Sequence, residues 1–226
     1  MKKILVIGST GQIGSELTMK LRSEYQPENV VAGYIPGAEP KGELAESGPK
    51  EVVDITNAQQ IADVVRRYDI DAIYNLAALL SAVAERKPLL AWHIGIDGLI
   101  NVLEVARENE CSVFTPSSIG SFGPNAPKDG TPQDTIQQPR TIYGVTKVTG
   151  ELLSNYYFMY LQGDGSWTKP TDTTYSKLSA ANNVTTNGYL ASARTNCCSS
   201  WHDSTSRTSW CAISTSRLPM PPDSIT

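Results

Sequence analysis

The stretch that decides the fold is Ile4-Leu5-Val6-Ile7-Gly8-Ser9-Thr10-Gly11-Gln12-Ile13-Gly14. Its apolar run predicts a buried strand that ends at Gly8, and a helix is expected to begin near Gln12. The first glycine permits a tight turn, the second lets the backbone approach a pyrophosphate, and the third lets the helix pack closely on its strand. Because N–H groups at a helix start attract anions, the predicted phosphate-binding residues are Gly8, Gly11, Gln12, Ile13 and Gly14.

Composition argues against several classes of function. The chain has 226 residues, 40% of them hydrophobic, and a net charge of −4, which argues against nucleic acid and anionic membranes as partners. No segment reaches the roughly 18 consecutive apolar residues of a membrane span, and Ile4–Ile7 is too short for a signal peptide, so a cytoplasmic protein is expected. No metal site is predicted, because no metal-ligand spacing is found among Cys111, Cys197, Cys198, Cys211, His93 and His202.

Residues 1–157 alternate between expected strands and helices in the order that builds a parallel sheet. Strands are predicted at 3–7, 29–33, 51–53, 71–75 and 112–116. Helices are predicted at 12–23, 58–68, 88–109 and 142–157, and residues 123–141 are expected to form a surface loop. Right-handed crossovers then give an α/β fold, a Rossmann-like doubly wound parallel sheet with helices on both faces.

The composition changes at about Phe158. Ser and Thr make up 23 of the 69 residues of 158–226 but only 19 of the first 157, while Val, Ile, Leu and Phe fall from 42 residues to eight. Such a segment buries too little apolar surface to offset its chain entropy. It is either a natural Ser/Thr-rich tail or the product of a lost reading frame, and its lack of Glu, together with three of the four Trp, favours the second. The chain is therefore divided into a dinucleotide-binding domain, 1–157, and an irregular tail, 158–226.

A tyrosine and a lysine stand one helical turn apart in Tyr143-Gly144-Val145-Thr146-Lys147. A spacing of four places both side chains on one helix face. A nearby ammonium stabilises a phenolate, so Tyr143 is a candidate base that takes a proton from a substrate alcohol while hydride leaves the same carbon for a nicotinamide. The alternative is an ordinary exposed helix face, because this spacing is common.

Serines follow the fifth predicted strand in Pro116-Ser117-Ser118-Ile119-Gly120-Ser121-Phe122-Gly123. Ligands of doubly wound sheets bind beyond the carboxyl ends of the strands, so the hydroxyl of Ser118 is expected to hydrogen-bond the reacting oxygen and orient Tyr143. The alternative is that these serines satisfy turn backbone, which is the role expected of Ser117 and Ser121.

Two shorter stretches complete the predicted cofactor site. Asn75-Leu76-Ala77-Ala78 follows the fourth strand, and its small residues leave room for a dinucleotide across the sheet edge. Asp54-Ile55 follows the third strand, where Asp54 is a candidate acceptor for an adenine amino group. Asp54 is equally expected as a solvated loop residue or as a helix cap before Thr56. The cofactor-binding set is thus extended by Asp54, Ile55, Leu76, Ala77 and Ala78. The family resemblance described next adds Tyr143 and Lys147 to this set.

The order of these motifs resembles the extended short-chain dehydrogenases/reductases of the NAD-dependent epimerase/dehydratase family. Over residues 1–157 the segments 76–81, 115–124 and 131–134 are most similar to bacterial L-threonine 3-dehydrogenases. The resemblance implies NAD as the cofactor and oxidation of the threonine hydroxyl to give 2-amino-3-oxobutyrate. It also implies a catalytic trio of Ser118, Tyr143 and Lys147, with Lys147 on the nicotinamide ribose. The substrate contacts that it implies come from Ser81, Ser118 and Tyr143.

The sequence departs from the family pattern in three places. Gly33-Tyr34-Ile35 stands where the second strand usually ends in an acidic residue that selects NAD, so these residues leave NAD and NADP open. Gly95 stands where many relatives have an asparagine that positions the catalytic lysine through water. Family members also continue into a small substrate-binding lobe, which is expected to be missing or disordered here because no trace of it follows Phe158. Impaired activity is therefore expected.

Two other functions stay open. A nucleotide-sugar epimerase or dehydratase shares the trio but needs a nucleotide-diphosphate pocket in the second lobe. A non-catalytic dinucleotide-binding protein is the alternative from another class, although the presence of both Tyr143 and Lys147 counts against it. The resemblance further implies a small-molecule substrate, L-threonine or a related alcohol. It also implies a homodimer formed through helices 88–109 and 142–157, weakened if missing strands leave an open sheet edge.

Overall fold

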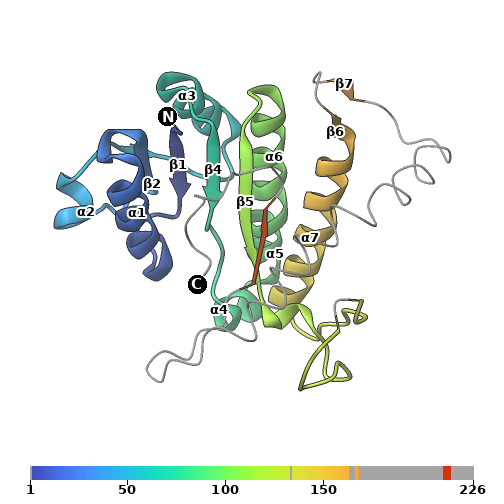
Figure 1. Cartoon of the computed structure of the whole chain (residues 1–226). Helices are drawn as coiled ribbons and strands as arrows, with labels where there is room; N and C mark the ends of the chain where they lie inside the picture. Colours follow the sequence, from blue (N-terminus) through green and yellow to red (C-terminus); the bar gives the residue numbers. More distant parts are fainter. Residues whose placement is uncertain (1, 133, 163–165, 168–210, 215–226) are drawn as a thin grey trace.

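The structure is a computed structural model that describes residues 2–132, 134–162, 166–167 and 211–214, with side chains up to Tyr157 (Figure 1). One sheet has the strand order β3-β2-β1-β4-β5-β8, and β6 and β7 form a separate pair. The first five strands of the main sheet are parallel, as predicted, and their ends differ from the prediction by at most one residue. The strands are β1 (Ile4–Ile7), β2 (Val30–Tyr34), β3 (Lys50–Val52), β4 (Ala72–Asn75), β5 (Ser112–Ser117), β6 (Leu161–Gln162), β7 (Ser166–Trp167) and β8 (Cys211–Ser214).

β1 lies inside the sheet and pairs with β2 on one side and with β4 on the other. All of its residues are buried, as expected of a strand that is covered on both faces. Ile7 is in register with both Gly33 and Asn75, so the carboxyl ends of three strands meet at one edge of the sheet. The glycine turn and the segment after Asn75 therefore leave the sheet side by side.

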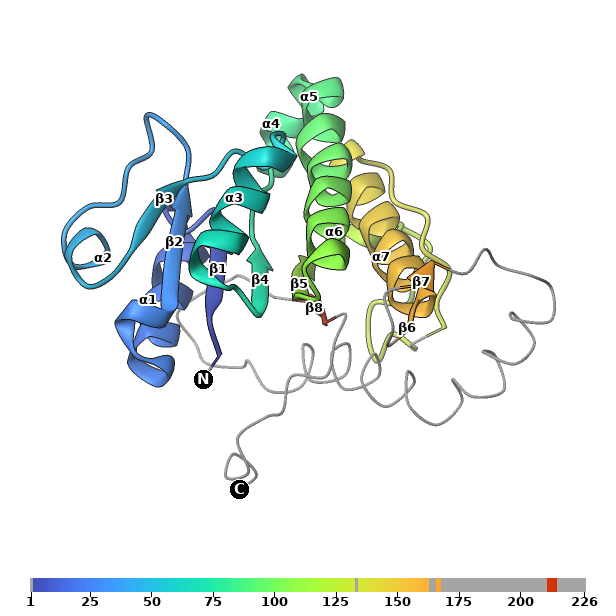
Figure 2. The ribbon, with the colours of Figure 1, turned by 90° about the horizontal axis from the view of Figure 1, so that it is seen from above.

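Helices cover both faces of the sheet, as the doubly wound prediction requires. Successive side chains of a strand point to opposite faces, and β1 shows this alternation. Ile4 and Val6 belong to one core cluster with Leu21 of α1 (Gln12–Tyr25). Leu5 and Ile7 belong to the other cluster. That second cluster includes residues of three helices that lie side by side in Figure 2, namely α3 (Ala58–Tyr68), α6 (Gly98–Glu108) and α7 (Ile142–Tyr160).

The helix boundaries agree with the prediction best where a side chain caps the helix. α3 has the predicted bounds, and the side chain of Asn57 accepts a hydrogen bond from the Gln60 N–H at its start. α1 and α7 end later than predicted, at Tyr25 and Tyr160. Two short helices were not predicted, because four to six residues carry too little periodicity to be recognised. They are α2 (Glu43–Glu46) and α4 (Ser81–Arg86).

The long helix predicted at 88–109 is formed by three successive segments, α5 (Pro88–Trp92), a π-helical segment (His93–Asp97) and α6. Together they span Pro88–Glu108, 21 residues that contain a window of 18 residues with a mean hydropathy of 1.4. By length and composition alone this helix could cross a membrane, so the prediction that no stretch is apolar enough for a membrane span is corrected. The same helix contributes Leu99, Val102 and Leu103 to the core, and a core helix has a similarly apolar composition.

Most of the predicted tail lies outside the described residues. β6, β7 and β8 come from the segment that the sequence predicts to be irregular, and none of them was expected. β8 pairs antiparallel with β5 over Phe114–Ser117, at the edge where an open strand was predicted. An edge strand presents unpaired N–H and C=O groups, which attract a further extended segment. The division of the chain at about Phe158 stays a prediction.

Candidate cofactor and active site

The glycine turn is packed too tightly for larger residues. Gly8 has a φ of +83°, and a Cβ at this residue would lie 3.2 Å from the Ala77 backbone nitrogen. A Cβ at Gly14 would lie 2.0 Å from the Gly8 carbonyl oxygen, so only glycine lets α1 approach β1 this closely. Gly11 has more room, because its Cβ would lie 3.4 Å from the same oxygen. The packing role predicted for the third glycine is therefore seen directly.

The start of α1 fits a pyrophosphate. Gly11 occupies the N-cap position with no side-chain cap, and the first turn contains no acidic residue. The first N–H groups of the helix, beginning at Gln12 and Ile13, therefore meet any ligand at this end together with the positive end of the helix dipole. The Ser9 hydroxyl donates to the Gly33 carbonyl at 2.9 Å and fixes the turn against β2. These residues are suited to hold the phosphates of a dinucleotide.

Asp54 and Ile55 follow β3 but are already engaged locally. Asp54 Oδ1 accepts hydrogen bonds from the Thr56 N–H at 2.9 Å and from the Thr56 hydroxyl at 2.8 Å. The Ile55 side chain is buried in the core, and its carbonyl accepts from Asn101 Nδ2 at 3.0 Å. The helix cap itself is Asn57 and not Asp54, so the capping alternative is wrong. The adenine contact stays a prediction.

The segment after β4 lies against the glycine turn. The Leu76 N–H donates to the Ile7 carbonyl at 2.9 Å, and the Ala77 N–H donates to Asn75 Oδ1 at 3.2 Å. Ala77 and Ala78 line the pocket described below, as their small size predicts. Ser81 is exposed at the first position of α4 and does not belong to the lining of this pocket.

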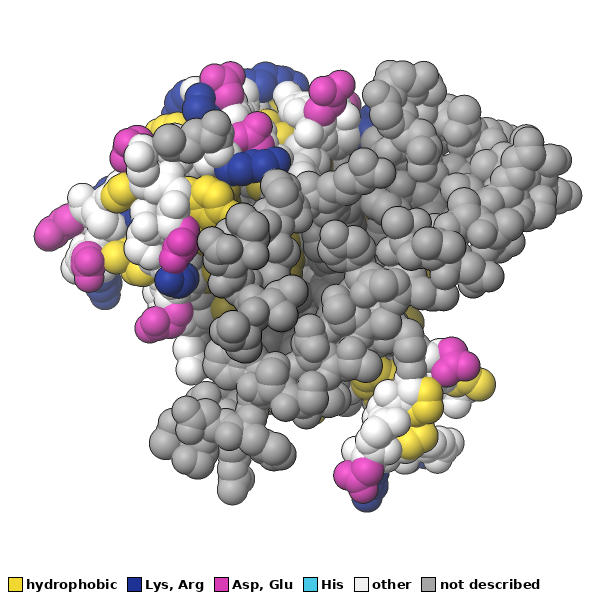
Figure 3. Space-filling model, in the orientation of Figure 1, with side chains coloured by type: hydrophobic (Ala, Val, Ile, Leu, Met, Phe, Trp, Pro, Cys, Tyr) yellow, Lys and Arg dark blue, Asp and Glu magenta, His cyan; other side chains and the backbone are white. Residues whose placement is uncertain are grey.

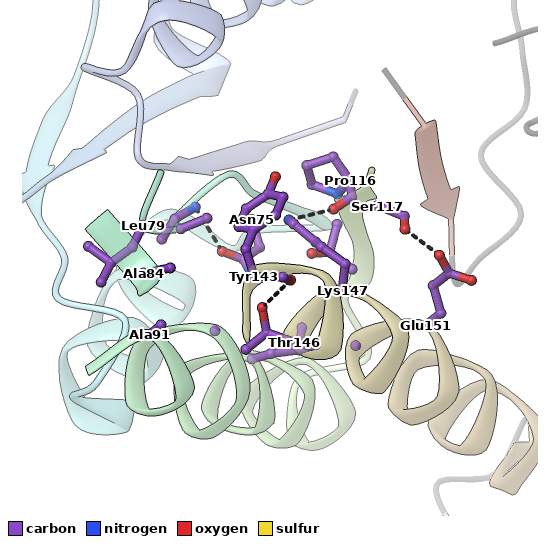
Figure 4. A pocket seen from close by; sticks show the side chains of 16 residues that line it. Asn75, Leu79, Ala84, Ala91, Pro116, Ser117, Tyr143, Thr146, Lys147 and Glu151 are labelled. Carbon is purple, nitrogen blue, oxygen red and sulfur yellow. Dashed lines mark hydrogen bonds between the residues drawn. The ribbon is translucent and has the colours of Figure 1, made fainter. Parts of the chain in front are cut away.

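Tyr143 and Lys147 lie one turn apart at the start of α7, as the spacing predicts (Figure 4). Lys147 Nζ lies 5.5 Å from the centroid of the Tyr143 ring. The same nitrogen donates to the Pro116 carbonyl at 2.9 Å. Burial lowers the pKa of Lys147 to about 8, and the charge of Glu151 acts in the opposite direction. The alternative of an ordinary exposed helix face does not describe these two residues, since neither side chain is fully exposed.

Ser118 lies close to Tyr143, and both side chains border Gly120. The Ser118 Oγ accepts from the Gly120 N–H at 3.1 Å and caps the short 3-10 helix Ile119–Ser121. A Cβ at Gly120 would lie 3.4 Å from Tyr143 Cδ1 and 3.5 Å from Ser118 Oγ. Ser118 and Tyr143 thus lie close together at the end of β5 and the start of α7, although Ser118 is not among the residues that line the pocket described below.

Ser117 and Ser121 do not act as predicted. The Ser117 hydroxyl donates to Glu151 Oε1, and the Ser121 hydroxyl accepts from Gln137 Nε2 at 3.1 Å. Gln137 Nε2 also donates to Glu151 Oε2 at 3.0 Å. The expectation that these serines only satisfy turn backbone is therefore wrong, because Ser117 bonds a buried carboxylate and Ser121 bonds a side-chain amide. Glu151 was missed, although its position one turn after Lys147 could have revealed it.

One pocket joins these elements at the sheet edge. Figure 4 shows Tyr143 and Lys147 reaching from α7 toward the ends of β4 and β5, with Glu151 one turn further along the helix. The side chains of Leu79, Ala84 and Ala91 border the pocket from the segment after β4 and from α4 and α5. The complete lining is Asn75, Ala77, Ala78, Leu79, Ala84, Ala91, Gly95, Leu99, Thr115, Pro116, Ser117, Tyr143, Thr146, Lys147, Gly150 and Glu151.

Comparison with known proteins identifies the class. The chain belongs to the NAD dependent epimerase/dehydratase family, which it matches over residues 4–207. A protein of Staphylococcus epidermidis described as an uncharacterized epimerase/dehydratase is 51% identical over 159 residues, which are 70% of this chain and 50% of that protein. A Staphylococcus aureus protein with the same description is 50% identical over 159 residues, 70% of this chain and 49% of that protein. The chain spans about half the length of these curated relatives.

Solved structures of L-threonine dehydrogenases have a similar fold. The L-threonine dehydrogenase of Clostridium difficile has a TM-score of 0.65 and 55% sequence identity. The match covers 70% of this chain and 49% of the chain of that enzyme. The GalE-like enzyme of Cupriavidus necator, in its holo form, has a TM-score of 0.64 and 41% identity over 69% of this chain and 50% of its own. The UDP-glucose 4-epimerase of Thermotoga maritima has a TM-score of 0.63, but its 23% identity supports the fold alone.

These findings confirm the predicted membership of the extended short-chain dehydrogenases/reductases and the Rossmann-like sheet. NAD is the cofactor of the family, which answers at family level the question that Gly33-Tyr34-Ile35 leaves open. The relatives are oxidoreductases and epimerases, so the class is enzymatic.

Proposed function

We propose that the protein is an NAD-dependent oxidoreductase that converts L-threonine to 2-amino-3-oxobutyrate. The observation that carries the proposal is that Tyr143 and Lys147 line one pocket with Ala77. The Ser118 hydroxyl lies close to Tyr143, on the other side of the space next to Gly120. The identity of 55% with the L-threonine dehydrogenase of Clostridium difficile supports threonine as the substrate.

The chemistry needs one hydride and one proton to leave the substrate. When bound, NAD accepts the hydride from the carbon that carries the threonine hydroxyl. Tyr143 takes the hydroxyl proton, and the ammonium of Lys147 stabilises the phenolate that performs this step. The Ser118 hydroxyl donates to the reacting oxygen and fixes its position. Ser81, exposed at the start of α4, is proposed to contact the rest of the substrate.

The cofactor is held by the predicted set. The glycine turn and the first turn of α1 bind the pyrophosphate, Asp54 accepts from the adenine amino group, and Lys147 binds the nicotinamide ribose. Leu76, Ala77 and Ala78 leave the sheet edge accessible to the dinucleotide. The backbone next to Ile55 contributes to the adenine side of the site, since the Ile55 side chain is in the core.

Turnover by this chain is proposed to be slow or absent, because the composition changes at about Phe158. We propose that 1–157 is the NAD-binding domain and that the reading frame was lost near its end. The coding DNA around Phe158 tests this directly. A second frame that encodes alternating strand and helix patterns with a Pro-Gly loop is the expected result, and its absence would favour a natural tail.

A homodimer and a cytoplasmic location are part of the proposal. Leu89, Trp92 and Leu152 are exposed on the helices that the resemblance assigns to a dimer interface. A second copy would remove this apolar surface from water. On the face shown in Figure 3, Lys and Arg side chains alternate with Asp and Glu over the described surface, which suits a small-molecule substrate better than nucleic acid.

Thermal unfolding and NADH absorbance test the function. NAD should raise the melting temperature, L-threonine should raise it further in the presence of NAD, and UDP-glucose should not. Any threonine-dependent NADH formation should disappear in Tyr143→Phe while NAD binding is retained. A larger stabilisation by UDP-glucose than by threonine would favour a nucleotide-sugar epimerase. Equal behaviour of Tyr143→Phe and the parent in every activity would favour a non-catalytic dinucleotide-binding protein, and rapid NADH formation would contradict the impaired turnover.

A further inference from the structure

Glu151 is a buried carboxylate that joins three segments of the candidate site. Its side chain lies on α7, accepts from the Ser117 hydroxyl at the end of β5, and accepts from Gln137 Nε2 in the loop 123–141 at 3.0 Å. The residue is 5% exposed. Both of these donors are uncharged, whereas a buried carboxylate is costly unless a positive charge lies near it.

Lys147 supplies that charge one turn earlier on the same helix. It is the cationic side chain among the residues that line the pocket. Lys147 Nζ holds the Pro116 carbonyl, and Glu151 holds the hydroxyl of the next residue, Ser117. Two consecutive residues of β5 are therefore hydrogen-bonded to two residues of α7 that are one turn apart. Ser118 is the next residue in the chain after Ser117, so these two hydrogen bonds fix the position of Ser118 relative to Tyr143.

The electrostatic surroundings of Lys147 are simple. Among the lining residues, Tyr143 and Glu151 are the other titratable groups. Burial lowers the pKa of Lys147 to about 8, and Glu151 opposes that shift. Charged side chains on the neighbouring elements have partners of their own or do not line the pocket: Glu85, Arg86 and Lys87 around α4, His93 and Asp97 on the π-helical segment, and Glu104, Arg107 and Glu108 on α6.

We propose that Glu151 is a positioning residue, whose carboxylate keeps Lys147 in its ammonium form and, through Ser117, holds the end of β5 on α7. The assignment rests on the proposed function for the roles of Lys147 and Ser118. Its two parts have different sources, since the charge acts on Lys147 and the hydrogen bond acts on β5. A variant that removes one part and keeps the other can separate them.

The titration of Lys147 tests the proposal in the full chain without NAD or threonine. Lysines labelled with 13C at Cε are followed by NMR as the pH is raised, and the Lys147 signal is assigned by its loss in Lys147→Arg. In Glu151→Gln, which removes the charge but keeps a hydrogen-bonding side chain, the midpoint should fall by about one pH unit. Ser117→Ala keeps the charge, so its midpoint should stay near that of the parent.

Glu104→Gln is the matched control. Glu104 also bonds α7, but through Tyr157, about 15 Å further along the helix than Lys147. Its midpoint should equal that of the parent. An unchanged midpoint in Glu151→Gln, or equal shifts in Glu151→Gln and Ser117→Ala, would overturn the proposal. If Glu151→Gln does not fold, Glu151→Asp moves the charge by one methylene and should lower the midpoint by less, and no shift there would be equally decisive. A failure of NAD to raise the melting temperature of the parent would instead count against the proposed function alone.

Discussion

Two regions of the molecule build the candidate site by different means. At the β1–α1 turn, backbone packs on backbone, and a Cβ at Gly14 would lie 2.0 Å from the Gly8 carbonyl oxygen. At the β5–α7 edge, the side chains of Lys147 and Glu151 reach back 31 and 34 residues to hold the strand. The first arrangement is steric, and its closest contact joins residues of one short stretch. The second is electrostatic and exists only after the chain has folded.

The contrast has a consequence for how each region responds to its surroundings. Steric packing is indifferent to pH, whereas a buried lysine and carboxylate respond to it. The β5–α7 edge also contains close backbone contacts, since a Cβ at Gly144 would lie 2.2 Å from the Gly120 carbonyl oxygen. The two regions therefore differ in the buried charges of Lys147 and Glu151, which only the β5–α7 edge contains. Variants can test whether these charges act independently of the steric packing.

The largest effect is expected at the steric region. Gly14→Ala places a methyl group against backbone atoms of Gly8 and Ser9 that cannot rotate away. The free energy of unfolding should fall by more than about 3 kcal/mol, and NAD binding should be lost because α1 moves away from β1. Urea unfolding and calorimetric titration with NAD measure the two effects.

Gly11→Ala is the control within the same turn. Its Cβ would meet the Gly8 carbonyl oxygen at 3.4 Å, an ordinary contact, so folding should be nearly unchanged. NAD binding should still weaken, because the added methyl group lies where the pyrophosphate approaches. Equal loss of stability in both variants would remove the distinction between the packing glycine and the binding glycine.

The same contrast explains how much of the site could be predicted. The spacing of Gly8, Gly11 and Gly14 and the pair of Tyr143 and Lys147 are local patterns, and the structure shows the expected packing and the shared helix face. The pairing of Ser117 with Glu151 joins residues from different elements, and no local pattern contains it. The parallel order of β1 to β5 could be predicted from the alternation of strands and helices. β8 could not be predicted, because its segment has no apolar pattern typical of a strand.

The half of the molecule that contains the β1–α1 turn is also held by a charged side chain, so it is not purely steric. Arg22 of α1 is 2% exposed and donates to the carbonyls of Leu44 at 2.8 Å and Pro49 at 2.7 Å, and to the Ser47 hydroxyl at 2.8 Å. Arg22→Leu should lower the free energy of unfolding by about 3 kcal/mol, because buried carbonyls lose their donors. Urea unfolding measures the change.

Lys20→Ala is the matched variant on the same helix. Lys20 forms an exposed ion pair with Glu24, so its loss should cost less than about 0.5 kcal/mol. If Arg22→Leu were as mild, the connection between β2 and β3 would be held by packing alone, and the steric description would extend to the whole cofactor half.

The charge of Lys147 should give the catalytic edge its pH dependence. Burial lowers its pKa to about 8, while an unfolded lysine has a pKa of about 10.4. Between these values the unfolded state binds more protons, so stability should rise with pH by on the order of 3 kcal/mol. Lys147→Met should lack this rise. Urea unfolding at several alkaline pH values measures the free energy of unfolding of both proteins. If this free energy changed with pH in the same way in the parent and the variant, the pKa of Lys147 would be the same in the folded and unfolded states.

A smaller effect than that of Lys147 is expected where α7 meets α6, away from the pocket. The Tyr157 hydroxyl donates to Glu104 Oε1 at 2.5 Å, and Arg107 Nη2 bonds Oε2 of the same carboxylate at 2.7 Å. Burial alone would raise the pKa of Glu104, but the hydrogen bonds from Tyr157 and Arg107 lower it below its ordinary value. This carboxylate therefore adds stability above its ordinary pKa, and the contribution is lost as the pH falls through the lower folded value.

Tyr157→Phe removes one of these donors with little change in volume. The free energy of unfolding at neutral pH should fall by about 1 kcal/mol. The difference between parent and variant should shrink in acid, because protonation of Glu104 weakens the same bond in the parent. Urea unfolding from neutral to acidic pH measures this convergence. A difference that stayed constant down to low pH would assign the role of Tyr157 to ring packing, and would leave Lys147 and Glu151 as the charged layer that distinguishes this half of the molecule.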